Sequence, residues 1–148
     1  ILRRQRQMCI RDRVKRAEKI FHNDSPLSED PFFKSKVAQI ELDLSALEMT
    51  ELRGLAAERE GKGPGAESSL LKIKGTELQQ RLTSLALEAA GHEALPFGGP
   101  YGFKDQEVSS SKAAQLTAAK YLNFRKVTIY GGTNEIQKNI IAKAVLGL

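Results

Sequence analysis

Apolar residues recur along this chain at three- and four-residue steps, the spacing that collects side chains on one face of an α-helix. The longest series consists of Val37, Ile40, Leu44, Leu47, Leu52 and Leu55. Ser28, Asp30 and Pro31 favour a helix start just before this series. The segment GKGPG at 61–65 favours its end, because glycine and proline continue a helix only at an energetic cost. The pattern predicts a long amphipathic helix between these two signals.

A second apolar stripe predicts another long helix, from about Glu67 to Ala90, with Gly91 as its stop. Its members are Leu71, Leu78, Leu82 and Leu85. Gly75 lies inside this segment, where glycine costs roughly 1 kcal/mol relative to alanine. We expect this glycine to mark a close crossing of two helices.

Shorter segments complete the pattern. A first helical segment extends to about Phe21, and a fourth helix starts near Ser110 or Ser111. The end of the fourth helix is ambiguous, because KAAQLTAAKYL favours helix whereas the following VTIY favours strand. Between these segments, HEALPFGGPYGFKDQEVSSS at 92–111 is rich in glycine and proline and predicts a long loop, a kind of segment that is often functional or mobile.

The last segment, from Thr133 onward, predicts a final amphipathic helix. Its apolar face consists of Ile136, Ile140, Ile141 and Val145. Four or five helices with apolar faces and no repeated unit predict an all-α fold, an antiparallel helix bundle.

Charge and cysteine content exclude several classes of protein. The net charge of the 148 residues is +5, but residues 1–13 hold five Arg against one Asp, which leaves 18 basic and 17 acidic residues in the other 135. A nucleic-acid module carries its basic residues within the folded unit, so no nucleic-acid partner is expected. Apolar runs are too short for a membrane span. The single Cys9 and two separated histidines predict no disulfide and no metal site, and favour a cytoplasmic protein.

The stretch IYGGTNEIQ contains the candidate chemistry of the chain. Gly131 and Gly132 allow the backbone to pass close to another group, and the hydroxyl of Thr133 can cap the helix that follows. The N–H groups at such a helix start favour an anionic or carbonyl-bearing ligand. The alternative is an ordinary helix–helix turn with a threonine cap and no ligand.

Three stretches resemble the acyl-CoA dehydrogenase family. IYGGTNEIQKNIIAKAVLGL is similar to the C-terminal signature of that family. PGAESSLLKIKGTELQQRLTSLALEAAG resembles an earlier block of the family, and QIELDLSALEMTELRGLAAE resembles the long helix before that block. The resemblance covers about residues 14–148. We expect these residues to form the C-terminal four-helix bundle of the family, and residues 1–13 to be a doubtful or non-native stretch.

The resemblance implies an activity that needs more than this bundle. Members of the family have an N-terminal helical domain and a middle β-domain, bind FAD, and oxidise acyl-CoA thioesters to the trans-2-enoyl form. Their electrons leave through an electron-transferring flavoprotein, and the bundle builds the contacts between subunits. The chain is therefore expected to be a fragment that is inactive alone and that belongs to a homotetramer or heterotetramer.

The resemblance assigns roles to individual residues. Thr133, Asn134 and Glu135 match the positions at the helix start that contact FAD. Gly132 matches the glycine whose backbone lies beside the thioester of the substrate. Gly91, with Glu88 before it, falls near a glycine-rich turn that contacts FAD in the family, although GHEALP departs from the pattern of that turn.

The position of the catalytic base departs from the most common family pattern. Many members carry Glu where this chain has Gly131, and glycine cannot accept a proton. Other members take their carboxylate from an earlier helix of the bundle, upstream of the second long helix. No catalytic base is therefore assigned to a residue of this chain. Glu135 is a weak substitute because it occupies a flavin-contact position.

Other residues and hypotheses have simpler explanations. His22 and His92 are expected to be ordinary surface residues, and Tyr101 and Phe103 to anchor the loop rather than contact flavin. Two alternatives to the enzyme hypothesis remain: a cofactor-free helical interaction module, and a non-catalytic partner subunit of a hetero-oligomer.

Overall fold

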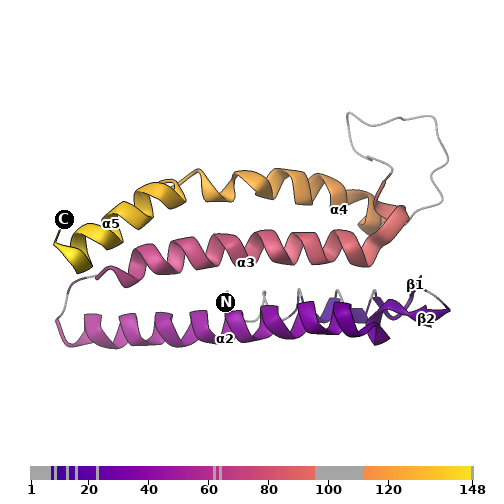
Figure 1. Ribbon diagram of the computed structural model, residues 1–148, viewed down its shortest axis with the longest axis horizontal. Helices are drawn as coiled ribbons and strands as arrows, with labels where there is room; N and C mark the ends of the chain where they lie inside the picture. The colour runs from indigo at the N-terminus through magenta and orange to yellow at the C-terminus, as the bar shows by residue number, and fades with distance from the viewer. Residues whose placement is uncertain are drawn as a thin grey trace. The chain divides into compact units, whose positions relative to one another are not determined.

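The computed structural model describes residues 8, 10–12, 14–15, 17–22, 24–61, 63, 65–95 and 112–147. The chain divides into two compact units. Unit 1 comprises residues 1–39 and 80–125, and unit 2 comprises residues 40–79 and 126–148. Each of the two long helices contributes one part to each unit, and Figure 1 identifies them by colour along the chain.

The helix that the sequence predicts to extend to Phe21 ends earlier. The described residues between 8 and 17 are helical, and Glu18 and Lys19 form a turn. Phe21–His22 (β1) then pairs antiparallel with Ser25–Pro26 (β2). Asp24, between the two strands, has a φ of 63°, which aspartate tolerates better than most residues and which permits this tight reversal. The prediction was wrong here because local turn chemistry overrode helix propensity.

The first long helix, α2, spans Pro31–Arg59 and confirms the start and stop signals in the sequence. A short 3₁₀ helix, η1 (Leu27–Glu29), precedes it. Asp30 then caps α2, because the N–H of Phe33 donates to its carboxylate over 2.8 Å. Pro31 occupies the first helical position, where its missing N–H costs nothing.

The second long helix, α3, spans Glu67–Ala90, which matches the prediction. In unit 2, the C-terminal part of α2 and the N-terminal part of α3 form an antiparallel pair (Figure 1). The core of this unit consists of Ile40, Leu44, Leu47, Ile73, Leu78 and Val127, each less than 9% exposed. A Cβ built on Gly75 would lie 4.0 Å from Leu47 Cδ2, so the helices meet at this glycine at an ordinary contact distance.

The apolar stripe of α2 is only partly buried. Ile40, Leu44 and Leu47 lie in the core, whereas Leu52 and Leu55 are 57% and 50% exposed. The predicted helical period is confirmed, but periodicity does not reveal how far along a helix its partners extend.

Unit 1 contains the C-terminal part of α3, a 3₁₀ helix η2 (Gly91–Ala94), and the helix α4 (Lys112–Asn123). Small residues allow η2 and α4 to approach closely: Ala90, Ala94 and Ala114 are at most 1% exposed and pack with Leu87. Arg125 links α4 to α3 by donating to Gln80 O over 2.9 Å and to Thr83 Oγ1 over 2.8 Å. Its guanidinium lies 4.2 Å from the centre of the Tyr121 ring.

The ambiguous segment after α4 is helical rather than extended. Phe124–Thr128 forms the 3₁₀ helix η3, followed by a turn at Ile129 and a bend at Tyr130. Val127 is 1% exposed, so this β-branched residue is buried in a helical turn and not in a strand. The last helix, α5, spans Asn134–Leu146. Apart from the β1–β2 pair, the described elements are therefore helical, and the predicted all-α helix bundle is confirmed.

Candidate functional site

The glycine pair before α5 forms a left-handed turn. Gly131 has a φ of 66° and Gly132 a φ of 83°, both in the region that side-chain-bearing residues rarely adopt. Both glycines are exposed. Tyr130 and Ile129 beside them are 56% and 64% exposed. The backbone of residues 131 and 132 is therefore exposed, because neither residue has a side chain that could cover it.

Thr133 caps α5 as the sequence predicts. Its hydroxyl oxygen accepts from the N–H of Ile136 over 3.3 Å, and its carbonyl accepts from the N–H of Gln137 over 3.0 Å. The Gln137 side chain folds back and donates to the carbonyl of Gly131 over 3.3 Å. A Cβ built on Gly132 would lie 2.6 Å from Gln137 Nε2, so any larger residue there would have to displace this amide. The φ of Gly132 therefore favours glycine, and a side chain there would also displace the flexible Gln137 amide from the carbonyl of Gly131.

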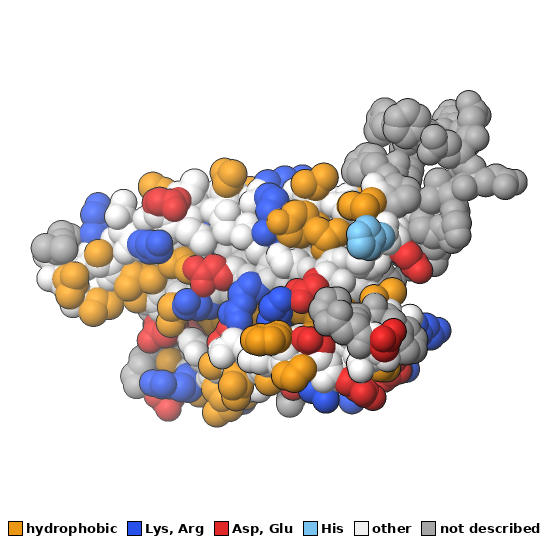
Figure 2. All heavy atoms as spheres, turned by 45° about the vertical axis from the view of Figure 1, so that its right-hand side comes forward, with side chains coloured by type: hydrophobic (Ala, Val, Ile, Leu, Met, Phe, Trp, Pro, Cys, Tyr) orange, Lys and Arg blue, Asp and Glu red, His pale blue; other side chains and the backbone are white. Residues whose placement is uncertain are grey.

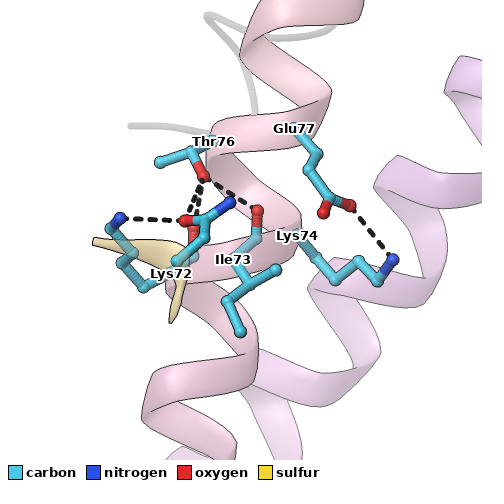
Figure 3. A network of polar contacts seen from close by, with 6 residues as sticks. Lys72, Ile73, Lys74, Thr76 and Glu77 are labelled. Carbon is cyan, nitrogen blue, oxygen red and sulfur yellow. Dashed lines mark hydrogen bonds and ion pairs between the residues drawn. The ribbon is translucent and has the colours of Figure 1, made fainter. Parts of the chain in front are cut away.

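Asn134, the first residue of α5, is 8% exposed, and its carboxamide faces the protein. Its Oδ1 accepts from Lys72 Nζ over 3.0 Å and from Thr76 Oγ1 over 3.4 Å. Lys72 also donates to the carbonyl of Thr128 over 3.3 Å. Figure 3 shows Lys72 and Thr76, which both project from α3 toward this network.

Glu135 is fully exposed, and its pKa lies below the ordinary value. The main cause is a hydrogen bond from its own backbone N–H, followed by one with the Thr133 side chain; the charges of Lys138 and Lys72 contribute less. A carboxylate with a lowered pKa is a poorer proton acceptor. The lowered pKa therefore argues against Glu135 as a substitute for the catalytic base.

The structure brings Gly131, Gly132, Thr133, Asn134 and Glu135 together in one continuous turn and helix start of unit 2. Gly91 belongs to unit 1, where it opens η2 with a φ of 52°. A Cβ built on Gly91 meets nothing within 4 Å, so its conformation, and not its size, calls for glycine. The flavin-contact roles of these residues stay predictions.

The remaining candidates of the sequence have ordinary surroundings where they are described. Glu88 accepts from the exposed Lys36 over 2.7 Å. His92 is exposed at η2. Tyr101, Phe103, Cys9 and the side chain of His22 lie outside the described residues. Among the described residues, no group of His, Cys, Asp and Glu is arranged to hold a metal ion, and none of the helices combines the length and apolar character that crossing a bilayer requires.

Sequence reasoning missed Lys72 and Thr76. The two residues are four positions apart, so their side chains share one face of α3, and this face borders the buried Ile73. The only sign of a polar contact in the sequence was a lysine and a threonine one helical turn apart, next to a predicted apolar stripe. Their partner, Asn134, is 62 residues from Lys72 along the chain, and nothing local could have identified it.

Comparisons with known proteins agree with the resemblance in the sequence. Residues 4–146 match the family described as acyl-CoA dehydrogenase, C-terminal domain. The acyl-CoA dehydrogenase IpdE1 of Mycobacterium tuberculosis is 29% identical over 124 residues, which cover 82% of this chain and 28% of the relative. The chain therefore spans less than a third of the length of that curated relative.

Solved structures share the fold. The ChsE4–ChsE5 complex from Mycobacterium tuberculosis contains a chain that matches with a TM-score of 0.68 and 24% identity, over 95% of this chain and 34% of that one. The FAD complex of PigA matches with a TM-score of 0.70 and 21% identity, over 95% of this chain and 32% of that one. At these identities, the likeness establishes the helical fold alone.

Proposed function

This chain belongs to the acyl-CoA dehydrogenase family through its C-terminal domain, and from that premise we propose that it is the FAD-contacting and subunit-contacting domain of a flavin-dependent acyl-CoA dehydrogenase. The observation that carries the proposal is the family match over residues 4–146, which includes every element of both units. The longer protein would convert acyl-CoA thioesters to their trans-2-enoyl form. The fragment alone would be inactive.

The turn before α5 fits a flavin dinucleotide for physical reasons. Gly131 and Gly132 are exposed and carry no side chain, so a ligand can approach their backbone. The positive end of the α5 dipole lies at Thr133 and Asn134, where it favours negative charge. One of the fold neighbours, PigA, was solved as an FAD complex, which supports the same ligand here.

Each residue of the turn has a separate part in the proposal. Thr133, Asn134 and Glu135 contact FAD, and the contact of Asn134 is through its backbone because its carboxamide is buried against Lys72. The backbone of Gly132 lies beside the thioester carbonyl of the substrate. When bound, FAD supplies a hydride acceptor for the oxidation of the thioester. Gly131 contributes no proton acceptor, and no residue of this chain is assigned as the carboxylate base. Gly91, in unit 1, is assigned a further FAD contact by the family resemblance.

Exposed apolar residues on α5 support a subunit interface. Ile136 is 52%, Ile140 45% and Val145 67% exposed, although the sequence places them on one apolar face. Hydrophobic side chains are visible on this part of the surface in Figure 2. Ile136 and Ile140 are four residues apart and share a face of α5, and neighbouring exposed apolar residues suit a surface that another chain covers. We include a homotetramer or heterotetramer in the proposal, with an electron-transferring flavoprotein as the redox partner.

The test uses the full-length protein that contains this chain. The purified protein is expected to carry about one FAD per subunit, and an acyl-CoA thioester is expected to bleach the flavin absorbance under anaerobic conditions. Adding an electron-transferring flavoprotein should restore the oxidised spectrum. Protein that is folded by circular dichroism but neither retains nor rebinds FAD would contradict the proposal.

A second candidate is a non-catalytic partner subunit, favoured by glycine at position 131 and by the complex of two proteins among the fold neighbours. In that case, the full-length protein binds a second, related chain, and only the pair reduces its flavin with acyl-CoA. Flavin reduction by the full-length protein alone would exclude this candidate. A cofactor-free interaction module would show neither FAD binding nor flavin reduction.

A further inference from the structure

Lys72 has an unusual position among the described lysines, because its single ammonium group contacts both ends of the turn before α5. It donates to the carbonyl of Thr128, the last residue of η3, over 3.3 Å. It also donates to Oδ1 of Asn134, the first residue of α5, over 3.0 Å. The segment between these contacts, residues 129–133, contains both glycines.

Within that segment, the N–H groups of Ile129 and Tyr130 donate to the carbonyl of Lys126 over 2.9 and 3.4 Å, whereas the glycine pair that follows has little rigidity of its own. Gly131 and Gly132 adopt positive φ values at no steric cost, and for the same reason they have many other conformations open to them. Apart from the Thr133 cap, the side chain of Gln137 contacts the turn by donating to the carbonyl of Gly131 over 3.3 Å. This hydrogen bond lies at the surface, so it constrains the turn only weakly. A constraint from outside the segment is therefore needed to fix the angle at which α5 leaves it.

The ammonium of Lys72 indicates that this residue does more than fill space beside α5. A cation near a helix N-terminus is disfavoured by the helix dipole, and a half-buried ammonium needs oxygen acceptors. Here the acceptors are one backbone carbonyl and one carboxamide that is itself buried. Thr76 reinforces the site only weakly, because its hydroxyl lies closer to the carbonyls of Ile73 and Lys72, at 2.9 and 3.0 Å, than to Asn134.

We propose that Lys72 is a positioning residue for the FAD-contacting turn: by holding Thr128 and Asn134 together, it fixes the backbone of residues 129–133 in the conformation that receives the cofactor. The inference rests on the proposed function for the identity of the ligand. Lys72 itself does not touch FAD or substrate. Its contribution to Glu135, whose pKa is lowered in small part by the Lys72 charge, agrees with this position near the helix start.

The test compares substitutions at Lys72 with a control on the same helix. Lys72→Met keeps the length of the side chain and removes the ammonium, and Lys72→Arg keeps charge and donors. Lys74→Met is the control, since Lys74 is 61% exposed and pairs with the neighbouring Glu77 over 3.1 Å (Figure 3). In the full-length protein, the dissociation constant for FAD is measured by titrating the apoprotein, together with the melting temperature of the apoprotein. Amide hydrogen exchange is followed at Ile129, Tyr130, Ile136 and Gln137, whose N–H groups are hydrogen-bonded at the two ends of the turn.

Lys72→Met is expected to weaken FAD binding about tenfold or more, the effect of losing a charge-assisted hydrogen bond pair. Amide exchange in the turn should accelerate by a similar factor. Lys72→Arg should recover most of the affinity, and Lys74→Met should stay within about twofold of the unsubstituted protein. If Lys72→Met does not fold, Lys72→Gln, which keeps one donor without the charge, takes its place with the same expectation.

Two results would overturn the inference. Unchanged exchange at Ile129, Tyr130, Ile136 and Gln137 on removal of the ammonium would show that Lys72 does not hold the turn. Faster exchange with unchanged FAD affinity would show that the turn is held but that its conformation does not govern cofactor binding. Failure of the unsubstituted protein to bind FAD would instead refute the proposed function, and the exchange data would still decide whether Lys72 fixes the turn.

Discussion

Adjacent glycines with similar backbone angles differ in their surroundings at the turn before α5. Gly131 and Gly132 both have positive φ, so any substitution at either position strains the backbone by roughly 1–2 kcal/mol. A Cβ at 131 would meet nothing within 4 Å, whereas one at 132 would lie 2.6 Å from Gln137 Nε2. The two positions therefore allow strain and steric obstruction to be separated.

We predict that Gly132→Val in the full-length protein lowers FAD content per subunit more than Gly131→Val does. Both variants carry the strain of a β-branched residue at positive φ, but only the first also has to displace the Gln137 amide, which donates to the carbonyl of Gly131 and braces the turn. FAD content is measured by absorbance after gel filtration, with circular dichroism to check folding. Equal FAD content in the two variants, at any level, would remove the specific role of Gly132.

A second prediction at the residue scale concerns the ionisation of Glu135. Its pKa is lowered by its own backbone N–H first and by the Thr133 side chain second, so Thr133→Val should raise this pKa toward the ordinary value of 4.5 without reaching it. Because the folded-state pKa is depressed, the stabilising contribution of the carboxylate is present above about pH 4.5 and is lost as the pH falls through the folded-state value.

Carboxyl ¹³C chemical shifts of Glu135 across an acid titration measure this pKa directly. Thr133→Ser is the matched control, because serine retains the hydroxyl and the ability to cap the helix. The serine variant should titrate like the unsubstituted chain. A pKa that does not move in the valine variant would show that the Thr133 hydroxyl does not reach the carboxylate.

Residue types in the turn were readable from the sequence because their reasons are local. Glycine at positive φ and threonine at a helix start are each dictated by a few neighbouring atoms. Asn134 was predicted as a ligand contact, but its burial against Lys72 depends on a residue 62 positions away. Such a contact leaves no local pattern, so its discovery required the fold.

At the scale of elements, the two long helices have exposed or half-buried glycines that can be compared. Gly75 is internal to α3, and a Cβ there would lie 4.0 Å from Leu47 Cδ2, within the range of ordinary contacts. Gly54 is internal to α2, and a Cβ there would meet nothing within 4 Å. Neither glycine has positive φ.

We predict that Gly75→Ala stabilises the chain by about 0.5–1 kcal/mol, because alanine has the higher helix propensity and the site has room for a methyl group. Gly54→Ala is the control for propensity alone and should give a gain of the same size. The free energy of unfolding is measured by urea denaturation. A loss of stability at residue 75 with a gain at residue 54 would mean that α2 and α3 approach more closely than an ordinary contact permits.

Helix boundaries could be predicted where capping or helix-breaking residues flank a clear apolar stripe. Both limits of α3 and the Asp30–Pro31 start of α2 follow from such signals. The VTIY segment could not be assigned, because β-branched residues favour strands locally and no neighbouring strand is visible in the sequence. The segment forms the 3₁₀ helix η3, in which Val127 is buried. The early end of the first helix reflects a turn that competes with helix propensity.

At the scale of the whole molecule, apolar periodicity predicted a bundle but not which stripes its own helices would cover. Ile10, in the stretch expected to be non-native, is 4% exposed and belongs to the buried core. In contrast, the face of α5 that the sequence assigned to a core is exposed at Ile136, Ile140 and Val145. Periodicity shows that a face is apolar and leaves open whether it packs within the chain or against another chain.

The exposed face of α5 leads to the last prediction. In the full-length protein, Ile140→Asp should dissociate the oligomer into smaller species, because a carboxylate would be buried in an apolar contact between subunits. Ile140 is 45% exposed in this chain, so the substitution should cost the fold itself little, about 1 kcal/mol or less. Asn139→Asp is the control, since it adds the same charge at the neighbouring exposed position outside the apolar stripe. Light scattering coupled to gel filtration gives the mass of each variant. A shift in mass for Ile140→Asp alone supports the interface on α5, whereas an unchanged mass for both variants would locate the subunit contacts elsewhere.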